Sequence, residues 1–518
     1  MDALAAVLAI TVAIALLFEV ARRLRLPWPS LFVLGGLALG FVPGLPHLEL
    51  KPDLVLLVFL PPLLFAAAIE SPIRDLKTDV WPIARLSIVL VLATAIVVAA
   101  VMHFVAGLDW APAFAFGAIV GPTDALAATT VFRHVPIPRR IVALVEGESL
   151  FNDATALVAY RTAVIATTSG TFVLANALGG FVAAVAGGIA IGLVVGFVAV
   201  QLFRRLDDPP VEVVISLVIP FAAYLPADQL GFSGVLAAVA AGLVIGSRLG
   251  TILGAPTRVL WLNTWKMVNF ILNGFLFVLV GLELPEILAG VGDGSAARLI
   301  GLIVVVGVAV VATRFAYVWL ASQLPNGPRA QIARYNPELA RRLVIVFGWS
   351  GLRGAVSLAA ALALPPDFPQ RNLLLLLTFA VIVITLVGQG LTLPRLARWA
   401  AWDGVEFGGD ETNRARAAAY EAGLAEILRL RDRWPGHLEL LDRLESGLND
   451  RTQHLATEDP DETAERRQER TEHEEIQRGV IDAQRAAVIE LRDRREINDR
   501  TLRLIERDLD LEELRAEG

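Results

Sequence analysis

The chain has 518 residues, of which 55% are hydrophobic and 19% charged, and its mean hydropathy is +0.61. No soluble globular domain needs so much apolar sequence, so the composition indicates a membrane protein. The absence of cysteine excludes disulfides, thiolate metal sites and cysteine nucleophiles. The net charge of −7 combines two unlike regions. We predict a transmembrane domain at residues 1–400 and a charged helical tail at 401–518.

Apolar runs separated by short polar breaks follow one another along residues 1–400. A helix needs about 20 mostly apolar residues to cross the hydrocarbon core. In lipid, backbone polar groups find no water, so each span is expected to be helical. The fold class predicted is therefore an all-α polytopic membrane protein. Thirteen spans are expected, the second and eighth being short, at residues 3–22, 29–43, 53–70, 82–106, 112–131, 141–160, 173–203, 211–224, 231–247, 260–284, 297–322, 341–364 and 372–397.

Basic residues are distributed unequally between alternate loops. If the loop after the first span is cytoplasmic, nearly all loop arginines fall on that side, and the other side holds only Lys51, Arg161, Arg298 and Arg371. Lys and Arg gather on the cytoplasmic side of membrane proteins. We therefore expect a multi-pass protein of the cytoplasmic (inner) membrane, with the N-terminus outside and the tail in the cytoplasm.

The tail is expected to contain three helices, at residues 411–432, 437–455 and 462–515. Trp434, Pro435 and Gly436 interrupt the first pair. Two interpretations remain open: a charged, solvated hairpin or bundle, which the residues favour, and a regulatory or dimerising element.

The sixth predicted span carries the most informative polar side chains. Asp153 lies about 18 Å along this helix from its inner end, near the bilayer midplane. Ser149 shares its face, and Glu148 and Asn152 form the adjacent stripe. Oxygen ligands of this kind suit hard cations. No basic residue of the same helix lies at the depth of Asp153, so this carboxylate is predicted to be functional.

Two other spans carry helix-breaking motifs. Gly121-Pro122-Thr123-Asp124 interrupts the fifth span, and Gly348–Ala355 places three glycines and Arg353 inside the twelfth. Because these spans are seven apart, they cross the membrane in opposite directions. A matched antiparallel pair of broken helices is expected of a transporter with inverted repeats. The structural alternative is that Pro122 only kinks its helix.

Glu148 is expected to form an ion pair with an arginine, since an unpaired buried charge is costly. Glu148 lies about 10 Å from the inner end of its span, Arg314 about 12 Å and Arg353 about 18 Å. Depth therefore favours Arg314, and Arg353 remains the alternative. Glu70 closes the third span, where a solvated cap and a functional role are equally plausible.

Four motifs occur in order: Pro61-Pro62-Leu63-Leu64-Phe65, Pro122-Thr123-Asp124, Glu148-Ser149 with Asn152-Asp153, and Gly351-Leu352-Arg353-Gly354-Ala355. Together they resemble the monovalent cation:proton antiporters of the first subfamily, the bacterial NhaP and eukaryotic NHE type. The resemblance covers about residues 1–400 and leaves the tail out.

The resemblance implies an NhaA-like antiporter fold with a dimerisation domain, a core domain and two crossed, discontinuous helices. It also implies a homodimer. In such proteins the aspartate matching Asp153 carries Na⁺ or the proton. Residues matching Ser149, Thr123 and Glu70 join the coordination of the cation. The residue matching Asp124 supports the site, and the glutamate matching Glu148 pairs with a core arginine.

The expected function is electroneutral 1:1 exchange of Na⁺ for H⁺ by alternating access, without enzymatic activity, cofactor or nucleic-acid partner. One titrating carboxylate accounts for this stoichiometry, because Asn152 adds no second acid. K⁺ or Li⁺ remain open as substrates. A cation channel is a rival interpretation. An intramembrane aspartyl protease with Asp124 and Asp153 as its dyad is another, although their unlike contexts speak against a shared proton.

Overall fold

The computed structural model forms two compact units, Met1–Phe407 and Gly408–Gly518. Within the described residues the regular structure is entirely helical, which confirms the all-α fold class. Lys51 and residues 462–478 of the predicted third tail helix lie outside the described residues. The structure describes residues 2–24, 26–42, 57–71, 73–132, 135, 137–169, 174–289, 296–323, 337–400, 409–455, 479–491, 493–494, 496, 501–502, 505–506 and 509.

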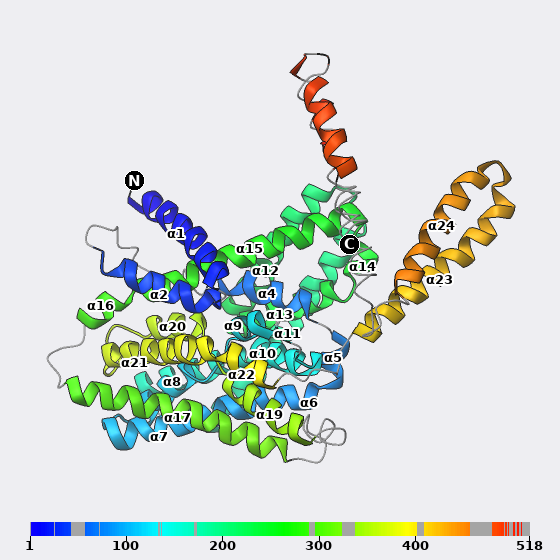
Figure 1. Ribbon diagram of the computed structural model, residues 1–518. Coiled ribbons are helices and arrows are strands. Elements are labelled where there is room, and N and C mark those ends of the chain that lie inside the picture. Colours follow the sequence, from blue (N-terminus) through cyan, green and yellow to red (C-terminus); the bar gives the residue numbers. More distant parts are fainter. Residues whose placement is uncertain are drawn as a thin grey trace. The chain divides into compact units, whose positions relative to one another are not determined.

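One group of helices in the first unit is built around α13 and α15. α13 packs against α4, α11 and α12, while α15 packs along α2 (Figure 1). Phe65, Phe203, Trp261 and Trp265 fill the apolar core between several of these helices. The group comprises α1 (Asp2–Leu24), α2 (Trp28–Gly40), α4 (Leu60–Glu70), α11 (Leu174–Phe203), α12 (Pro209–Gln229), α13 (Gly234–Gly246), α14 (Leu249–Ile252), α15 (Ala255–Leu282) and α16 (Leu284–Ala289).

A second group surrounds α8 and α10. α8 packs between α7 and α10, and α17 runs along α7 (Figure 1). The group comprises α5 (Ile73–Thr78), α6 (Val80–Ala84), α7 (Val91–Val101), α8 (Trp110–Ile119), α9 (Ala125–Phe132), α10 (Arg139–Ser169), α17 (Ala296–Ser322), α19 (Pro337–Trp349), α20 (Ala355–Leu362), α21 (Arg371–Val383) and α22 (Gly390–Ala400). Three π-helical segments, Arg85–Leu90, Met102–Ala106 and Ile384–Gln389, continue these helices without a break.

Six helical stretches among the described residues are long and apolar enough to cross a bilayer. They are Val80–Ala106, Leu178–Phe203, Pro209–Gln229, Ala255–Leu282, Ala296–Ser322 and Arg371–Ala400. Ile300, Val304 and Val308 form an exposed stripe along α17, as expected of a face that contacts lipid. Each predicted span coincides with helical residues, but the total of thirteen crossings stays a prediction.

The eighth span was expected to be short, at residues 211–224, and this expectation is wrong. α12 extends over 21 residues, Pro209–Gln229, with Pro220 and Pro226 inside the helix. Asp208 caps its first turn by accepting a hydrogen bond from the amide of Val211 at 3.1 Å. The helix continues through both prolines, because membrane helices tolerate internal prolines.

Two predicted spans are interrupted helices, as the sequence indicated. The fifth consists of α8 and α9 with a break at residues 120–124, and the twelfth consists of α19 and α20 with a break at 350–354. The breaks meet: the amide of Asp124 donates to the carbonyl of Leu352 at 2.8 Å. A backbone hydrogen bond therefore joins the two interruptions directly.

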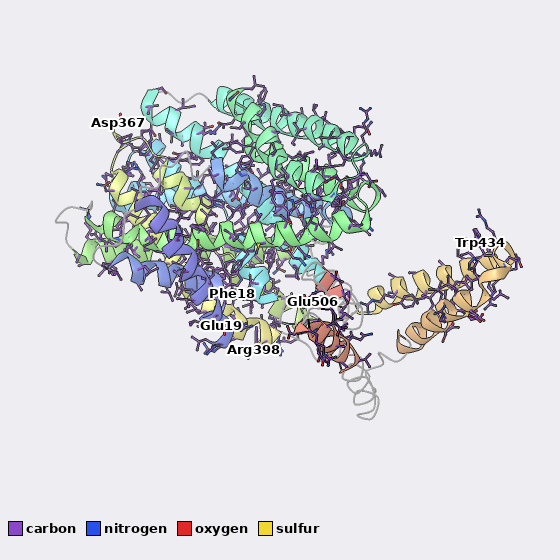
Figure 2. All side chains as sticks on the ribbon, turned by 90° about the horizontal axis from the view of Figure 1, so that it is seen from above. Phe18, Glu19, Asp367, Arg398, Trp434 and Glu506 are labelled. Carbon is purple, nitrogen blue, oxygen red and sulfur yellow. The ribbon has the colours of Figure 1, made fainter. Side chains whose placement is uncertain are left out.

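The second unit begins with an antiparallel hairpin of α23 (Gly409–Arg433) and α24 (Leu438–Leu455). Trp434 lies at the turn between them (Figure 2), next to a 3₁₀ turn at Pro435–His437. Arg431 bridges Asp442 and Glu445 across the hairpin, each at 2.5 Å. Residues 479–491 form a further helix. The chain then turns at Arg494 and bends at Glu496, so the uninterrupted helix expected over 462–515 is wrong there.

Candidate functional site

The carbonyl groups at the first break are satisfied by Arg353 from the second. Its guanidinium donates to the carbonyl of Gly121 and, at 2.8 Å, to that of Pro122. These carbonyls lie just past the end of α8, where no helical amide can reach them. Arg353 is 1% exposed, and its own amide donates to Thr385 Oγ1 at 3.1 Å. Arg353 therefore connects the two breaks, where the interrupted helices cross, through hydrogen bonds.

Asp124 lies at the start of two short helices. Its Oδ1 accepts a hydrogen bond from the amide of Leu126 at 2.8 Å and so caps α9. The same carboxylate lies against Gly354, the residue that precedes α20, so closely that a β-carbon there would collide with it. Gly354 is thus required by the close approach of Asp124. The positive ends of both helix dipoles favour a negative charge at this position.

Glu148 forms a buried bidentate ion pair with Arg314. The Nη1–Oε1 distance is 2.5 Å and the Nη2–Oε2 distance is 3.1 Å, with both side chains 2% exposed. Thr123 Oγ1 also donates to Glu148 Oε1 at 2.7 Å. The arginine crosses directly over Gly351, where a β-carbon would overlap its side chain. The structure thus pairs Glu148 with the arginine that depth favoured, and Arg353 has other partners.

Hydrogen bonds of two α10 side chains, one an amide and one a hydroxyl, connect this helix to the first break. Asn152 Nδ2 donates to Thr123 O at 3.0 Å and to Thr123 Oγ1 at 2.9 Å. One turn earlier, Ser149 Oγ accepts from the amide of Ala125 at 3.1 Å. The carbonyl and hydroxyl of Thr123 are therefore already engaged in hydrogen bonds before any ligand arrives.

A cavity of about 320 Å³ lies between α4 and α15 on one side and α9, α10 and α20 on the other. Asp153, Asp124, Thr123, Ser149 and Glu70 all line it. Asp153 is 7% exposed, and no described group forms a hydrogen bond or ion pair with its carboxylate. Glu70, in contrast, is exposed at the C-terminal end of α4. The other predicted residues are buried but do not line the cavity: Asn152, Glu148, Arg314 and Arg353.

Sequence reasoning missed several polar residues of the same cavity. Glu146 precedes the predicted cluster on α10 and lines the cavity. Asn269 and Asn273 line it from α15. The spacing of four between the two asparagines inside an apolar span was an available signal. Ser357, on the first turn of α20, also lines the cavity. It follows Gly354, the last glycine of the motif, by three residues, and nothing in the sequence distinguished it from an ordinary helical serine.

The arrangement suits a small hard cation and a proton. The cavity offers carboxylate, hydroxyl and amide oxygens, and the described residues contain no cluster of His, Cys and carboxylates of the kind that binds a transition metal. Asp124 is engaged at the start of α9, while Asp153 has no such partner. Their different surroundings disfavour a symmetric aspartyl dyad sharing one proton.

An all-helical membrane protein in which two interrupted helices cross beside a buried carboxylate belongs to the class of secondary transporters. A family model described as "Sodium/hydrogen exchanger, transmembrane" matches residues 7–399, and the chain belongs to this family. It is therefore a monovalent cation:proton antiporter, a multi-pass membrane protein that transports ions and is not an enzyme.

Relatives support this assignment over different lengths of the chain. An uncharacterised Na(+)/H(+) exchanger of Mycobacterium tuberculosis is 32% identical over 521 residues, covering 99% of this chain and 96% of the relative. The low-affinity Na(+)/H(+) antiporter NhaS1 of Synechocystis is 32% identical, covering 80% and 76%. The sodium, potassium, lithium and rubidium/H(+) antiporter of Bacillus pumilus is 34% identical, covering 72% and 58%.

The same fold occurs in a solved structure. The sodium proton antiporter MjNhaP1 from Methanocaldococcus jannaschii at pH 8 superposes with a TM-score of 0.58 at 20% identity, covering 77% of this chain and 99% of that one.

Proposed function

We propose that this protein exchanges Na⁺ for H⁺ across the cytoplasmic membrane by alternating access, and that Asp153 holds either ion in turn. The observation that carries the proposal is the environment of Asp153. It is a buried carboxylate without a hydrogen-bond partner among the described residues, on a cavity lined by other oxygen groups. A buried carboxylate in that position requires a cation or a proton to compensate its charge.

Charge balance around the crossing favours an electroneutral 1:1 exchange. Glu148 and Arg314 neutralise each other as a bidentate pair. Arg353 and Asp124, at the two breaks, have opposite formal charges that sum to zero, although each side chain bonds to backbone groups and not to the other. Asp153 is then the one uncompensated charge of the crossing, and either Na⁺ or H⁺ makes the set neutral. Without a bound ion, the change between the inward-facing and outward-facing states would take an uncompensated carboxylate past an apolar barrier. The empty protein therefore makes this change much less readily than the protein with Na⁺ or H⁺ bound.

The cation is proposed to bind Asp153 together with Ser149, the backbone carbonyl of Thr123 and Glu70, with Asp124 supporting the site. Ser149 and Thr123 lie on the cavity next to Asp153 and present oxygen atoms, as hard cations require. Asn152 supports the site as an amide. It donates two hydrogen bonds to Thr123, which an ionised aspartate could not do.

The proposed assembly is a homodimer with the N-terminus outside and the tail inside. The helices around α13 and α15 would form the dimerisation domain, and those around α8 and α10 the core domain. The basic residues concentrated in alternate loops support this orientation. The boundary between the membrane domain, residues 1–400, and the cytoplasmic tail, residues 401–518, follows the change in composition.

Exchange of K⁺ or Li⁺ for H⁺ is the second candidate. The relative from Bacillus pumilus is described as an antiporter of sodium, potassium, lithium and rubidium, which supports a site of broad cation specificity. A cation channel is less favoured. A channel does not need a carboxylate that binds either a cation or a proton but never both at once.

The test is ion exchange in proteoliposomes. The internal pH is followed while Na⁺, K⁺ or Li⁺ is added, with and without a clamp on the membrane potential. We expect a saturable, Na⁺-driven pH change that is insensitive to the clamp and lost in Asp153→Ala. Asp228→Asn is the matched control, because Asp228 is an exposed carboxylate away from the cavity.

Each outcome of this experiment supports or refutes a specific part of the proposal. A response to K⁺ alone would keep the mechanism and change the substrate. A sustained current under the clamp would refute electroneutrality, and flux without saturation would indicate a channel. If no cation moved protons at any pH, the antiport proposal would be wrong.

A further inference from the structure

Ser357 lines the cavity, and its buried hydroxyl has no hydrogen-bond partner among the described residues. Seven buried side-chain nitrogen and oxygen atoms of the described residues lack a hydrogen-bond partner. Of these, Ser357 Oγ is the one whose residue lines the cavity beside Asp153. Ser357 is 1% exposed. An unpaired buried hydroxyl costs free energy, so its position next to a cation site requires an explanation.

The position of Ser357 on its helix explains why its hydroxyl has no partner. Buried helical hydroxyls normally donate to a carbonyl three or four residues earlier, as Ser322 does to Trp319 at 2.7 Å and Thr378 to Leu374 at 2.8 Å. Ser357 is the third residue of α20, so the carbonyl four residues earlier belongs to Arg353, inside the break. The hydroxyl therefore lacks the usual helical acceptor for its proton, and no described group donates to its two lone pairs.

The other hydroxyl oxygens near Asp153 are already engaged. Thr123 Oγ1 donates to Glu148 and accepts from Asn152, and Ser149 Oγ accepts from the amide of Ala125. Each of these two oxygens accepts one hydrogen bond and therefore keeps at most one lone pair for a cation, whereas Ser357 Oγ accepts none. Ser357 Oγ can be recruited without breaking any bond to the protein.

We propose that Ser357 Oγ is a ligand of the transported cation, supplied by α20, in addition to the ligands from α10 and from the break between α8 and α9. This inference rests on the proposed exchange at Asp153. A ligand from α20 would link both interrupted helices through the bound ion. It would also make cation affinity depend on the first turn of α20, whereas proton binding needs Asp153 alone.

The first experiment compares Ser357→Ala with Ser322→Ala. Ser322 is a buried serine whose hydroxyl bonds within its own helix and whose side chain does not line the cavity. We expect Ser357→Ala to raise the Na⁺ concentration for half-maximal exchange about tenfold, as loss of one good oxygen contact to a charge predicts. Exchange at saturating Na⁺ should be retained, and Ser322→Ala should behave as wild type.

Measuring at alkaline pH separates a ligand from a hydroxyl that merely donates to Asp153. If Ser357 only stabilised the ionised carboxylate, its removal would strengthen proton competition, and the half-saturating Na⁺ concentration would return to the wild-type value once protons are scarce. A ligand predicts that the increase persists at high pH. Convergence with wild type at high pH would overturn the proposal.

Ser357→Cys gives a second, independent measurement and serves even if the alanine variant folds poorly. The chain has no cysteine, so the introduced thiol is unique. Sulfur is a soft ligand, so a thiol in contact with the ion favours soft Tl⁺ over hard Na⁺. We expect the ratio of Tl⁺ to Na⁺ exchange to rise roughly tenfold or more over wild type. An unchanged ratio would refute direct ligation.

These results remain distinguishable from failure of the proposed function. If wild-type protein moves no protons in response to any cation, the exchange proposal itself fails. If wild type exchanges Na⁺ and both Ser357 variants match it in half-saturation and in the Tl⁺ to Na⁺ ratio, only the role of Ser357 is refuted.

Discussion

Removing Arg314 should damage the protein far more than removing an exposed arginine of similar geometry. In Arg314→Met, Glu148 would keep its hydrogen bond from Thr123 but would lose both guanidinium contacts in a site where its side chain is 2% exposed. Breaking a buried ion pair from one side costs roughly 3–5 kcal/mol, because the remaining charge is uncompensated. For a chain of this size we expect the thermal midpoint in detergent to fall by about 5 °C or more.

Arg161→Met is the matched control. Arg161 and Asp228 also form an ion pair between two helices, at 2.6 Å, but their side chains are 49% and 38% exposed. Such surface pairs contribute about 0–1 kcal/mol, so the midpoint should fall by less than about 2 °C. The assay is the temperature at which half of the protein no longer elutes as a monodisperse peak.

A double variant tests the reasoning more directly. Glu148→Gln combined with Arg314→Met removes both charges and leaves an amide oxygen that can accept from Thr123. We expect it to recover at least half of the loss seen in Arg314→Met, because no uncompensated charge remains. If the double variant is less stable than Arg314→Met, or if Arg161→Met is equally damaging, the cost does not come from an isolated buried charge.

Three further predictions follow from the crossing. Gly351→Ala should lower the thermal midpoint because a β-carbon overlaps Arg314, whereas Gly301→Ala, which meets no atom within 4 Å, should leave the midpoint unchanged or raise it. Arg353→Gln should abolish Na⁺-driven proton movement in proteoliposomes, since two carbonyls at the first break lose their donor; wild-type exchange would disprove this role. Asn152→Asp should also lose exchange, because a carboxylate cannot donate to the carbonyl of Thr123, and wild-type activity would show that this bond is dispensable.

The sequence predicted the helices and the breaks well because both have local causes. Apolar runs of membrane length produce helices wherever they occur, and Pro122 and the glycines around Arg353 interrupt them by backbone effects that need no partner. The pairing of Glu148 with Arg314 was also accessible, because depth along a membrane helix can be counted from its end. These features depend on one coordinate, the distance along the membrane normal.

Contacts between different helices could not be predicted in the same way. The bonds from Arg353 to the carbonyls of Gly121 and Pro122 join residues more than 200 positions apart, and depth alone did not identify them. Asn269 and Ser357 were missed because a cavity is defined by several helices at once. The extent of α12 was underestimated because the helix continues at both ends beyond the predicted apolar run, from Pro209 to Gln229.

The mutual bonding of the two breaks has a consequence for biogenesis. The carbonyls of Gly121 and Pro122 receive their donor from Arg353, and the amide of Asp124 finds its acceptor in Leu352. These bonds cannot form until the ribosome has synthesised more than 200 further residues. During insertion, the first interrupted helix therefore exposes polar backbone groups that water or the insertion machinery must satisfy. A chain truncated before Arg353 should accordingly be recognised as unfinished by membrane quality control, however many hydrophobic spans it already contains.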